Sequence, residues 1–303
     1  MILVMNMKTF NIELNETLDL SKYDVNLNNN TNLLLTNSIL KANKIGSYKI
    51  LLDNKECIIN VFNDNELSST FEINYERFSN KSLLILGDSV SAKETIGLEN
   101  KTYSKLMEEN LNLKHLHNAA IGGTTLTYMY EGSNIDKEYH NNERAIDCCR
   151  VVKRLEDEDK LKDFDYVIIA YGHNDQHFKD EIEEENKKVL SLDDVHSFNN
   201  SFRYVVNTLR KHNPLIKILV LNCTYSTYDI NGNSPYGNKY GYHDYRKANK
   251  EMAKELNLKH LDPWEYMKEY FDFNTKWIYY QDCVHISPIG HQKLYEFIVN
   301  KPL

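Results

Sequence analysis

The chain has 303 residues, with 36 Lys and Arg against 44 Asp and Glu, so its formal net charge at pH 7 is −8. This acidic balance argues against a general nucleic-acid binder, because phosphate recognition needs a concentrated basic surface. No uninterrupted apolar run reaches the roughly 18 residues that a membrane span needs, so we expect no transmembrane helix. The length fits one large domain or two smaller ones.

The first ten residues mix apolar and polar side chains and lack the basic start and continuous apolar stretch of a signal peptide. We therefore expect a cytoplasmic protein, or an extracellular or surface protein whose export signal lies outside this sequence. The cysteines are too few and too scattered for a disulfide framework, and we expect reduced, buried thiols. They are Cys57, Cys148, Cys149, Cys223 and Cys283.

The chain changes character near residue 80. Residues 1–80 are rich in short alternating runs, and two of these, Tyr48–Leu52 and Cys57–Phe62, flank a short polar turn. This pattern predicts a β-hairpin. We therefore expect residues 1–80 to form a small all-β, sandwich-like accessory module of Ig-like or jelly-roll-like type, followed by a second domain over residues 81–303.

Strands and helices are expected to alternate in the second domain. Apolar runs predict strands at Leu83–Leu86, Tyr166–Gly172 and Ile216–Leu221, and Lys114–Ala119 and Lys259–Leu261 are further short strand candidates. Helical spacing is found over Tyr103–Leu111, Val195–Lys211, Tyr245–Leu256 and Pro288–Val299. This alternation predicts an α/β domain whose parallel sheet is covered by helices on both faces. In such sheets the functional site lies beyond the carboxyl ends of the strands.

The strand ends carry four blocks with chemical potential. In chain order they are Gly87-Asp88-Ser89, Asn118–Gly123, Gly172-His173-Asn174-Asp175 and, before the last helix, Asp282-Cys283-Val284-His285. Each block alone is a weak signal, but the ordered set resembles the SGNH (GDSL) hydrolase family over about residues 82–300. The resemblance implies a three-layer α/β/α, flavodoxin-like domain with a five-stranded parallel sheet, acting as a serine esterase through an acyl-enzyme.

The resemblance also implies roles for single residues. Ser89 is the expected nucleophile, and it needs a neighbouring base because a serine hydroxyl is a poor nucleophile. His285 is the expected base, and Asp282 the acid that orients and stabilises its imidazole. The family's oxyanion hole maps onto Ser89, Gly123 and Asn174 as hydrogen-bond donors. Gly122 directly precedes Gly123 and stays an alternative donor.

Other candidates have simpler interpretations. A second Asp-x-x-His pattern, ending in His196, lies at a predicted helix start, where Asp193 or Asp194 is expected to be the N-cap. Asp88 is expected to support the turn, and His173 and Asp175 to belong to loop architecture. No metal or cofactor is expected, since three histidines considered as ligands lack helical ligand spacing. These histidines are His115, His117 and His140.

The segment after the fourth strand is rich in tyrosine and is expected to overhang the site. Its tyrosines are Tyr225, Tyr228, Tyr236, Tyr240, Tyr242 and Tyr245, and the first four are the predicted substrate-binding residues. Tyrosine combines an apolar face with a hydroxyl, which suits stacking on sugar rings. A β-module before such a domain also resembles carbohydrate esterases with an accessory β-domain.

These observations predict a carbohydrate O-acetylesterase, or deacetylase, that acts on an acylated carbohydrate or another small ester. A GDSL lipase, thioesterase or acyltransferase that acts on acyl chains remains an alternative. A catalytically vestigial glycan-binding or surface module is a further alternative, although a pure binder has no need for Ser89, Asn174, Asp282 and His285 together. The N-terminal module is expected to bind glycan or to mediate oligomerisation.

Overall fold

The computed structural model describes residues 8–13, 17–44, 46–62, 78–93, 101–129, 147–178, 181–184, 187–226, 239–271 and 276–300. The chain divides into two compact units. The first, called the β-unit, comprises Met1–Phe71 and Glu269–Asp282, and the second, called the α/β-unit, comprises Glu72–Lys268 and Cys283–Leu303. None of the described helices is long and apolar enough to span a membrane.

The β-unit contains two sheets in the part that is described. One has the order β1 (Lys8–Glu13), β7 (Lys55–Phe62), β6 (Gly46–Leu52), β3 (Val25–Asn26), and the other β2 (Thr17–Asp19), β5 (Ile39–Ala42), β4 (Leu33–Thr36). Strands β6 and β7 form the predicted antiparallel hairpin. Asp53 and Asn54 form its turn with φ of 52° and 63°, a left-handed conformation that Asp and Asn tolerate better than most residues.

Both sheets contribute to one apolar core in the β-unit. Leu40 comes from β5, and Ile50 and Ile59 come from the hairpin, all fully buried. The helix α9 (Lys276–Tyr279) contacts β6 and β7, although it lies more than 200 residues further along the chain. The small all-β character expected for the N-terminal region is confirmed, and a segment from near the C-terminus packs with it.

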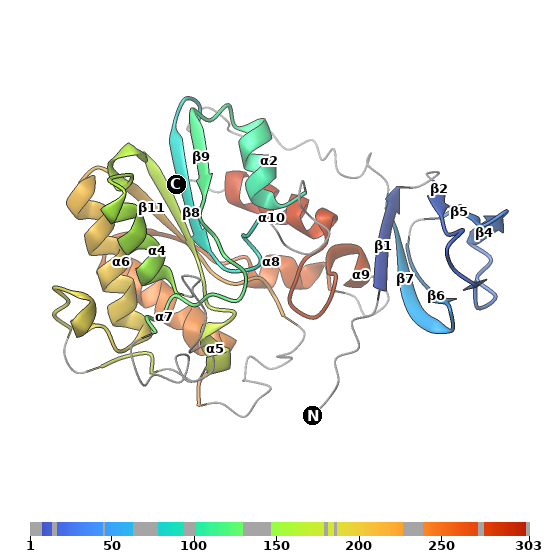
Figure 1. The fold of residues 1–303 in the computed structure, drawn as a ribbon. Coiled ribbons are helices and arrows are strands. Elements are labelled where there is room, and N and C mark those ends of the chain that lie inside the picture. The colour runs from blue at the N-terminus through green and yellow to red at the C-terminus, as the bar shows by residue number, and fades with distance from the viewer. Residues whose placement is uncertain are drawn as a thin grey trace. The chain divides into compact units, whose positions relative to one another are not determined.

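The α/β-unit is built on a parallel sheet, as predicted (Figure 1). Its five described strands have the order β12 (Lys259–Leu261), β11 (Lys217–Leu221), β10 (Tyr166–Ala170), β8 (Ser82–Gly87), β9 (His115–Asn118). In chain order this is the 2-1-3-4-5 arrangement of flavodoxin-like folds. Strand β8 is buried along its whole length, which explains its unbroken apolar sequence.

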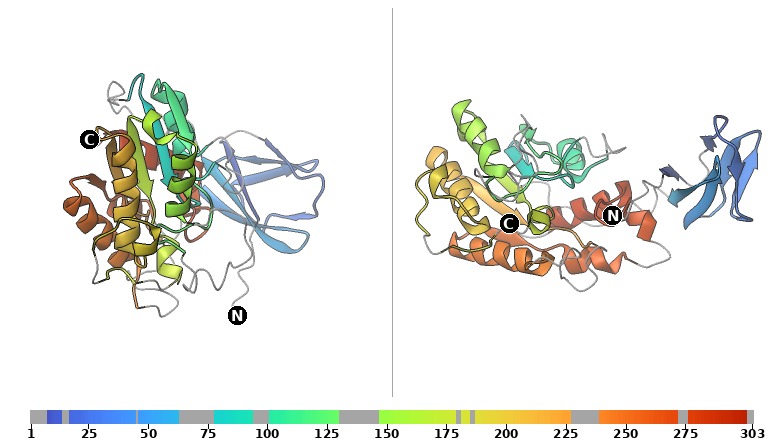
Figure 2. Two further views of the ribbon diagram at one scale, coloured as in Figure 1. Left: turned by 60° about the vertical axis from the view of Figure 1, so that its left-hand side comes forward. Right: turned by 60° about the horizontal axis from the view of Figure 1, so that its bottom comes forward.

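Helices cover both faces of this sheet (Figures 1 and 2). The helices α4 (Cys148–Asp157), α6 (Phe198–His212) and α7 (Tyr242–Glu255) pack in sequence with one another, and α2 (Tyr103–Asn110) packs with α10 (Pro288–Asn300). Shorter helical segments are η1 (Leu161–Asp163), α5 (Asp175–Phe178), η2 (Leu192–Asp194) and α8 (Trp264–Glu269). Phe198 and Phe202 from α6 join Leu84 and Val167 from the sheet in one fully buried core. The five cysteines are free, and all except the half-buried Cys283 are buried.

The helix α6 begins later than the sequence predicted. Its N-cap is Ser197, whose hydroxyl accepts a hydrogen bond from the backbone N–H of Asn200 at 3.2 Å. The predicted N-cap, Asp193 or Asp194, is wrong, because Asp194 instead closes a capping box with Ser191 around the preceding η2 turn. Val195 is extended and separates the two elements.

Gly87 at the end of β8 is expected to tolerate no side chain. A Cβ atom there would lie 2.6 Å from Ser91 Oγ and 3.1 Å from the carbonyl oxygen of Ala170. Gly87→Ala should therefore lower the free energy of unfolding by about 1–3 kcal/mol, the usual cost of overpacking. Urea denaturation measures this change. Adding Ser91→Gly removes the nearest atoms and should restore part of the loss, whereas wild-type stability in Gly87→Ala would contradict the close packing.

Candidate active site

The candidate site lies where β8 and β10 pair. These strands run parallel with Gly87 opposite Ala170, so both chains leave the sheet at the same edge. Strand β9 pairs on the other side of β8, which makes this pair the point at which the strand order reverses. Open α/β sheets bind ligands in the crevice beyond such a point. Ser89 and Asn174 follow directly after these two strand ends.

The structure brings Ser89 and His285 together across 196 positions of sequence. The Nε2 atom of His285 lies 2.8 Å from the Oγ atom of Ser89, a normal hydrogen-bond distance. For Nε2 to accept the serine proton, the neutral imidazole must carry its own proton on Nδ1. Both side chains are half-buried, so the pair is reachable by a substrate. A base therefore sits against the hydroxyl that the sequence predicted as nucleophile.

The turn that carries Ser89 is held by Asp88. The buried Asp88 carboxylate accepts a hydrogen bond from the backbone N–H of Val90 at 3.0 Å through Oδ1. The backbone N–H groups of Ser91 and Ala92 donate to the Asp88 carbonyl oxygen at 3.1 and 3.0 Å. Ser89 lies within the turn that these hydrogen bonds close. Asp88 therefore supports the turn, as expected from the sequence.

Asn174 is positioned as an amide donor. Its Nδ2 atom donates to the carbonyl oxygen of Thr124 at 2.8 Å. An amide nitrogen carries two hydrogens, so one can hold the side chain in place while the other donates to a substrate oxygen. This geometry is compatible with the oxyanion role predicted for Asn174.

Two adjacent glycines lie in the loop after β9. Gly123 has a φ of +79°, a conformation that favours glycine. Gly122 lies against the turn that carries Ser89, since a Cβ built on it would be 3.7 Å from the Cβ of Ser89. Gly123 as the oxyanion donor stays a prediction, and Gly122 stays its alternative.

Asp175 fastens this loop to the end of β10. Its fully buried carboxylate accepts hydrogen bonds from the backbone N–H groups of Leu126 and Thr127, at 3.1 and 2.9 Å, and from the Thr127 hydroxyl at 2.7 Å. Burial raises the pKa of Asp175 to about 6, although these donors favour the ionised form. Asn174 and Asp175 thus bind the same loop, Thr124–Thr127, from neighbouring positions.

The loop before α10 is tied to the segment after β11. The Ser226 hydroxyl donates to the carbonyl oxygen of Cys283 at 3.0 Å. Asp282 is exposed and precedes His285 by three residues. Its role as the acid of a triad stays a prediction.

The predicted tyrosine cluster is distributed differently from the expectation. Tyr225 is buried against the Trp264 ring, with centroids 5.2 Å apart, and the Tyr240 hydroxyl donates to Glu181 at 2.8 Å. Tyr242 and Tyr245 belong to α7 and are buried, so the expectation that they overhang the site in a loop is wrong. Tyr228 and Tyr236 lie outside the described residues, and substrate binding by Tyr225, Tyr228, Tyr236 and Tyr240 stays a prediction.

Two polar residues near the site had no assigned role in the sequence. The Nδ2 atom of Asn118 donates to the Ser91 carbonyl at 2.8 Å and to the Ser104 hydroxyl at 2.9 Å, which joins β9 to the turn that carries Ser89. His291 is fully buried in α10, and its Nδ1 atom accepts from the Tyr103 backbone N–H at 3.2 Å. Burial, with a smaller effect of the His285 charge, lowers the pKa of His291 to about 3. Asn118 could have been found from its place in the second block, whereas nothing local marks His291.

The histidines considered as metal ligands show ring packing instead. His115 and His117 on β9 both pack against the Phe164 ring, with centroids 6.3 and 6.0 Å away. His140 lies outside the described residues. No group of three or more His, Cys, Asp or Glu side chains is arranged to hold a metal ion within the described ranges.

Comparisons with known proteins identify the family of this chain. The model of the GDSL-like lipase/acylhydrolase family matches residues 85–293, so the chain belongs to this family of ester hydrolases. A protein from Lactobacillus plantarum is similar in structure, with a TM-score of 0.52 and 20% identity over 73% of this chain and 95% of that one. A variant of an acetyl-xylooligosaccharide esterase from Geobacillus has a TM-score of 0.47 and 17% identity over 74% and 96%. No curated protein matches significantly.

The pKa of Asp175 predicts a pH-dependent contribution to stability. Between its ordinary pKa of 3.8 and about 6, the folded state binds more protons at Asp175 than the unfolded state does. The contribution is therefore present below about pH 4 and falls as the pH rises through 6, by at most about 3 kcal/mol. Asp175→Asn does not titrate, so the stability gap between wild type and this variant should narrow from pH 4.5 to pH 7.

Urea denaturation at both pH values measures this gap. The exposed Asp193 provides the control, because Asp193→Asn removes a carboxylate that makes no buried contact and should leave the gap constant. A gap for Asp175→Asn that widens with pH would show that the three donors outweigh burial.

Proposed function

We propose that this chain is a serine esterase that removes a short acyl group, most simply an O-acetyl group, from a carbohydrate. The observation that carries the proposal is the 2.8 Å contact between His285 Nε2 and Ser89 Oγ at the sheet's reversal point. A base in this position can activate the serine hydroxyl, which is inert without one. Membership of the GDSL-like lipase/acylhydrolase family supports ester hydrolysis as the class of reaction.

The reaction proceeds in two halves. Ser89 Oγ attacks the ester carbonyl carbon while His285 Nε2 takes the hydroxyl proton, and the tetrahedral oxyanion accepts hydrogen bonds from the Ser89 N–H and the Asn174 amide. Gly123, or Gly122, is the proposed third donor. The C–O bond to the alcohol then breaks, and the alcohol takes the proton from His285, which leaves an acyl-enzyme.

Water completes the cycle by the same steps. His285 removes a proton from water, the resulting oxygen nucleophile attacks the acyl carbon, and Ser89 departs after recovering its proton from His285. Asp282 is the proposed acid that stabilises the imidazolium in both halves. The proposed steps use the chain's own backbone N–H groups and side chains, the substrate and water.

The carbohydrate part of the proposal is supported by the segment after β11. Cys223 and Thr224 line a small pocket with Asp88 and His173, and Ser226 is bonded to the loop that carries His285. This segment continues in sequence to Tyr228 and Tyr236. Tyrosine side chains are suited to hold sugar rings through their apolar faces, so the sequence of this segment supports a carbohydrate substrate.

Removing the proposed catalytic groups should separate their roles. Ser89→Ala and His285→Ala should each lower kcat on 4-nitrophenyl acetate by at least about 10³-fold, and Ser89→Ala should also abolish labelling by a fluorophosphonate probe. Asn174→Ala should lower kcat by about 10²–10³-fold, since one oxyanion donor is lost. His196→Ala, at the second Asp-x-x-His pattern, is the matched control and should keep wild-type activity. Retained activity without Ser89 or His285 would show that the nucleophile or base is misassigned, and an unlabelled wild type would favour a binding module.

Acyl-chain and glycan assays test the substrate. We expect kcat/KM for 4-nitrophenyl acetate to exceed that for the octanoate ester by at least about 10-fold, because short acyl groups need no long apolar channel. Tyr228→Ala and Tyr236→Ala should raise KM for an O-acetylated oligosaccharide without changing KM for 4-nitrophenyl acetate. Preference for acyl chains of about eight carbons or more would instead support a lipase or thioesterase.

A further inference from the structure

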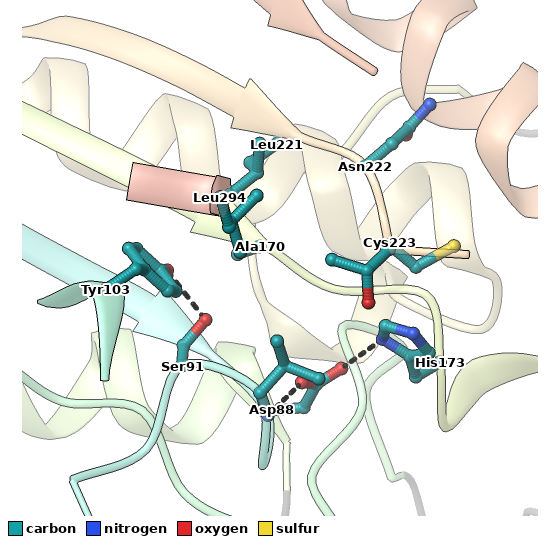
Figure 3. Close-up of a pocket in the computed structure, with 11 residues that line it drawn as sticks. Asp88, Ser91, Tyr103, Ala170, His173, Leu221, Asn222, Cys223 and Leu294 are labelled. Carbon is teal, nitrogen blue, oxygen red and sulfur yellow. Dashed lines mark hydrogen bonds and ion pairs between the residues drawn. The ribbon is translucent and has the colours of Figure 1, made fainter. Parts of the chain in front are cut away.

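Beneath the strand ends, two buried titratable side chains face each other. Figure 3 shows the His173 ring directed toward the Asp88 carboxylate, in a pocket that Ser91 and Tyr103 also line. The Nδ1 atom of His173 lies 3.6 Å from the Oδ2 atom of Asp88. Asp88 is only 1% exposed and His173 only 5%. The proposed reaction uses neither side chain directly.

Each member of this pair directly precedes a residue of the proposed site. Asp88 comes before the nucleophile Ser89, and His173 comes before the oxyanion donor Asn174. The two oxygens of Asp88 divide their contacts, because Oδ1 holds the turn through the Val90 N–H and Oδ2 faces His173. The pair therefore connects the end of β8 to the end of β10 through side chains, one residue away from both reacting groups.

Asp88 and His173 depend on each other for polar contacts. Within the described residues, Asp88 Oδ2 and His173 Nε2 have no hydrogen-bond partner, so the contact with His173 Nδ1 is the main polar interaction of Asp88 Oδ2. The Tyr242 ring packs edge-on against His173, with centroids 5.7 Å apart, and closes the other side. In such a water-poor setting a polar contact is stronger and harder to replace than at the surface.

We propose that His173 is a positioning residue, which acts through Asp88 to fix the distance between the Ser89 hydroxyl and the Asn174 amide. This inference rests on the proposed function. A nucleophile and an oxyanion donor must be held together to within a fraction of an ångström, because displacement by about 1 Å can cost 10²-fold in rate. Backbone pairing ends at Gly87 and Ala170, so beyond the sheet this separation depends on side chains.

The test compares two nearly isosteric substitutions. His173→Leu and His173→Asn leave cavities of similar size, but only Asn keeps a polar group near the position of Nδ1. We expect His173→Leu to lower kcat for 4-nitrophenyl acetate by about 10–100-fold with KM changed less than about 3-fold, since the oxyanion donor is displaced and not lost. His173→Asn should restore kcat to within about 3-fold of wild type, although both variants lose similar thermal stability.

The same pair of substitutions at His260 on β12 is the matched control. His260 is partly buried and its Nε2 atom has no described hydrogen-bond partner, so its Leu and Asn variants report packing alone and should share one kcat. Equal kcat values for His173→Leu and His173→Asn, or a Leu variant within about 3-fold of wild type, would overturn the proposal. If His173→Leu does not fold, His173→Met and His173→Gln provide the same comparison. An inactive wild type that a fluorophosphonate does not label would refute the proposed function itself, which keeps the two failures distinct.

Discussion

The parallel pairing of β8 with β10 is the constraint on which the site depends. Because Gly87 lies opposite Ala170, the nucleophile turn and the asparagine loop leave the sheet side by side. Gly87 also lets the chain turn back closely enough for Ser91 to pack against the strand end. A side chain at this position would collide with Ser91 and the Ala170 carbonyl oxygen, so the two loops would have to move apart. The contact between Ser89 and His285 would then need a different backbone position for Ser89.

Beyond the sheet, buried carboxylates take over from backbone pairing. Asp88 holds the nucleophile turn and Asp175 holds the loop after β9, each through donors that come from the backbone. Burying a carboxylate is costly, and for Asp175 the cost is visible as a raised pKa, to which the charge of Asp88 adds after burial itself. The two buried carboxylates fix the geometry of these loops at a cost in stability, which is a common compromise at catalytic sites.

The sequence was sufficient to predict the parallel sheet, and it places the proposed catalytic residues at the strand ends, for a physical reason. Buried parallel strands must be continuously apolar, so the runs at β8, β10 and β11 stand out, and chemistry then concentrates in the few polar residues that follow them. The N-cap of α6 and the burial of Tyr242 and Tyr245 were mispredicted, because capping by Ser197 and packing of α7 depend on neighbours in space. The contact of α9 with β6 and β7 likewise joins distant parts of the chain, and local periodicity cannot predict it.

The four sequence blocks contain the residues that are proposed to react, whereas the positions of these residues also depend on their neighbours within the blocks. His173 occupies such a place, between Gly172 and the proposed oxyanion donor Asn174. A surface histidine there would be free to vary in conformation, but this one is buried between Asp88 and the Tyr242 ring. This packing restricts the His173 side chain just beyond the end of β10, where strand pairing no longer fixes the backbone. On the proposed arrangement, the contact of His173 also holds the backbone of the adjacent Asn174. A preorganised oxyanion hole requires such rigidity, because its donors must be in place before charge develops.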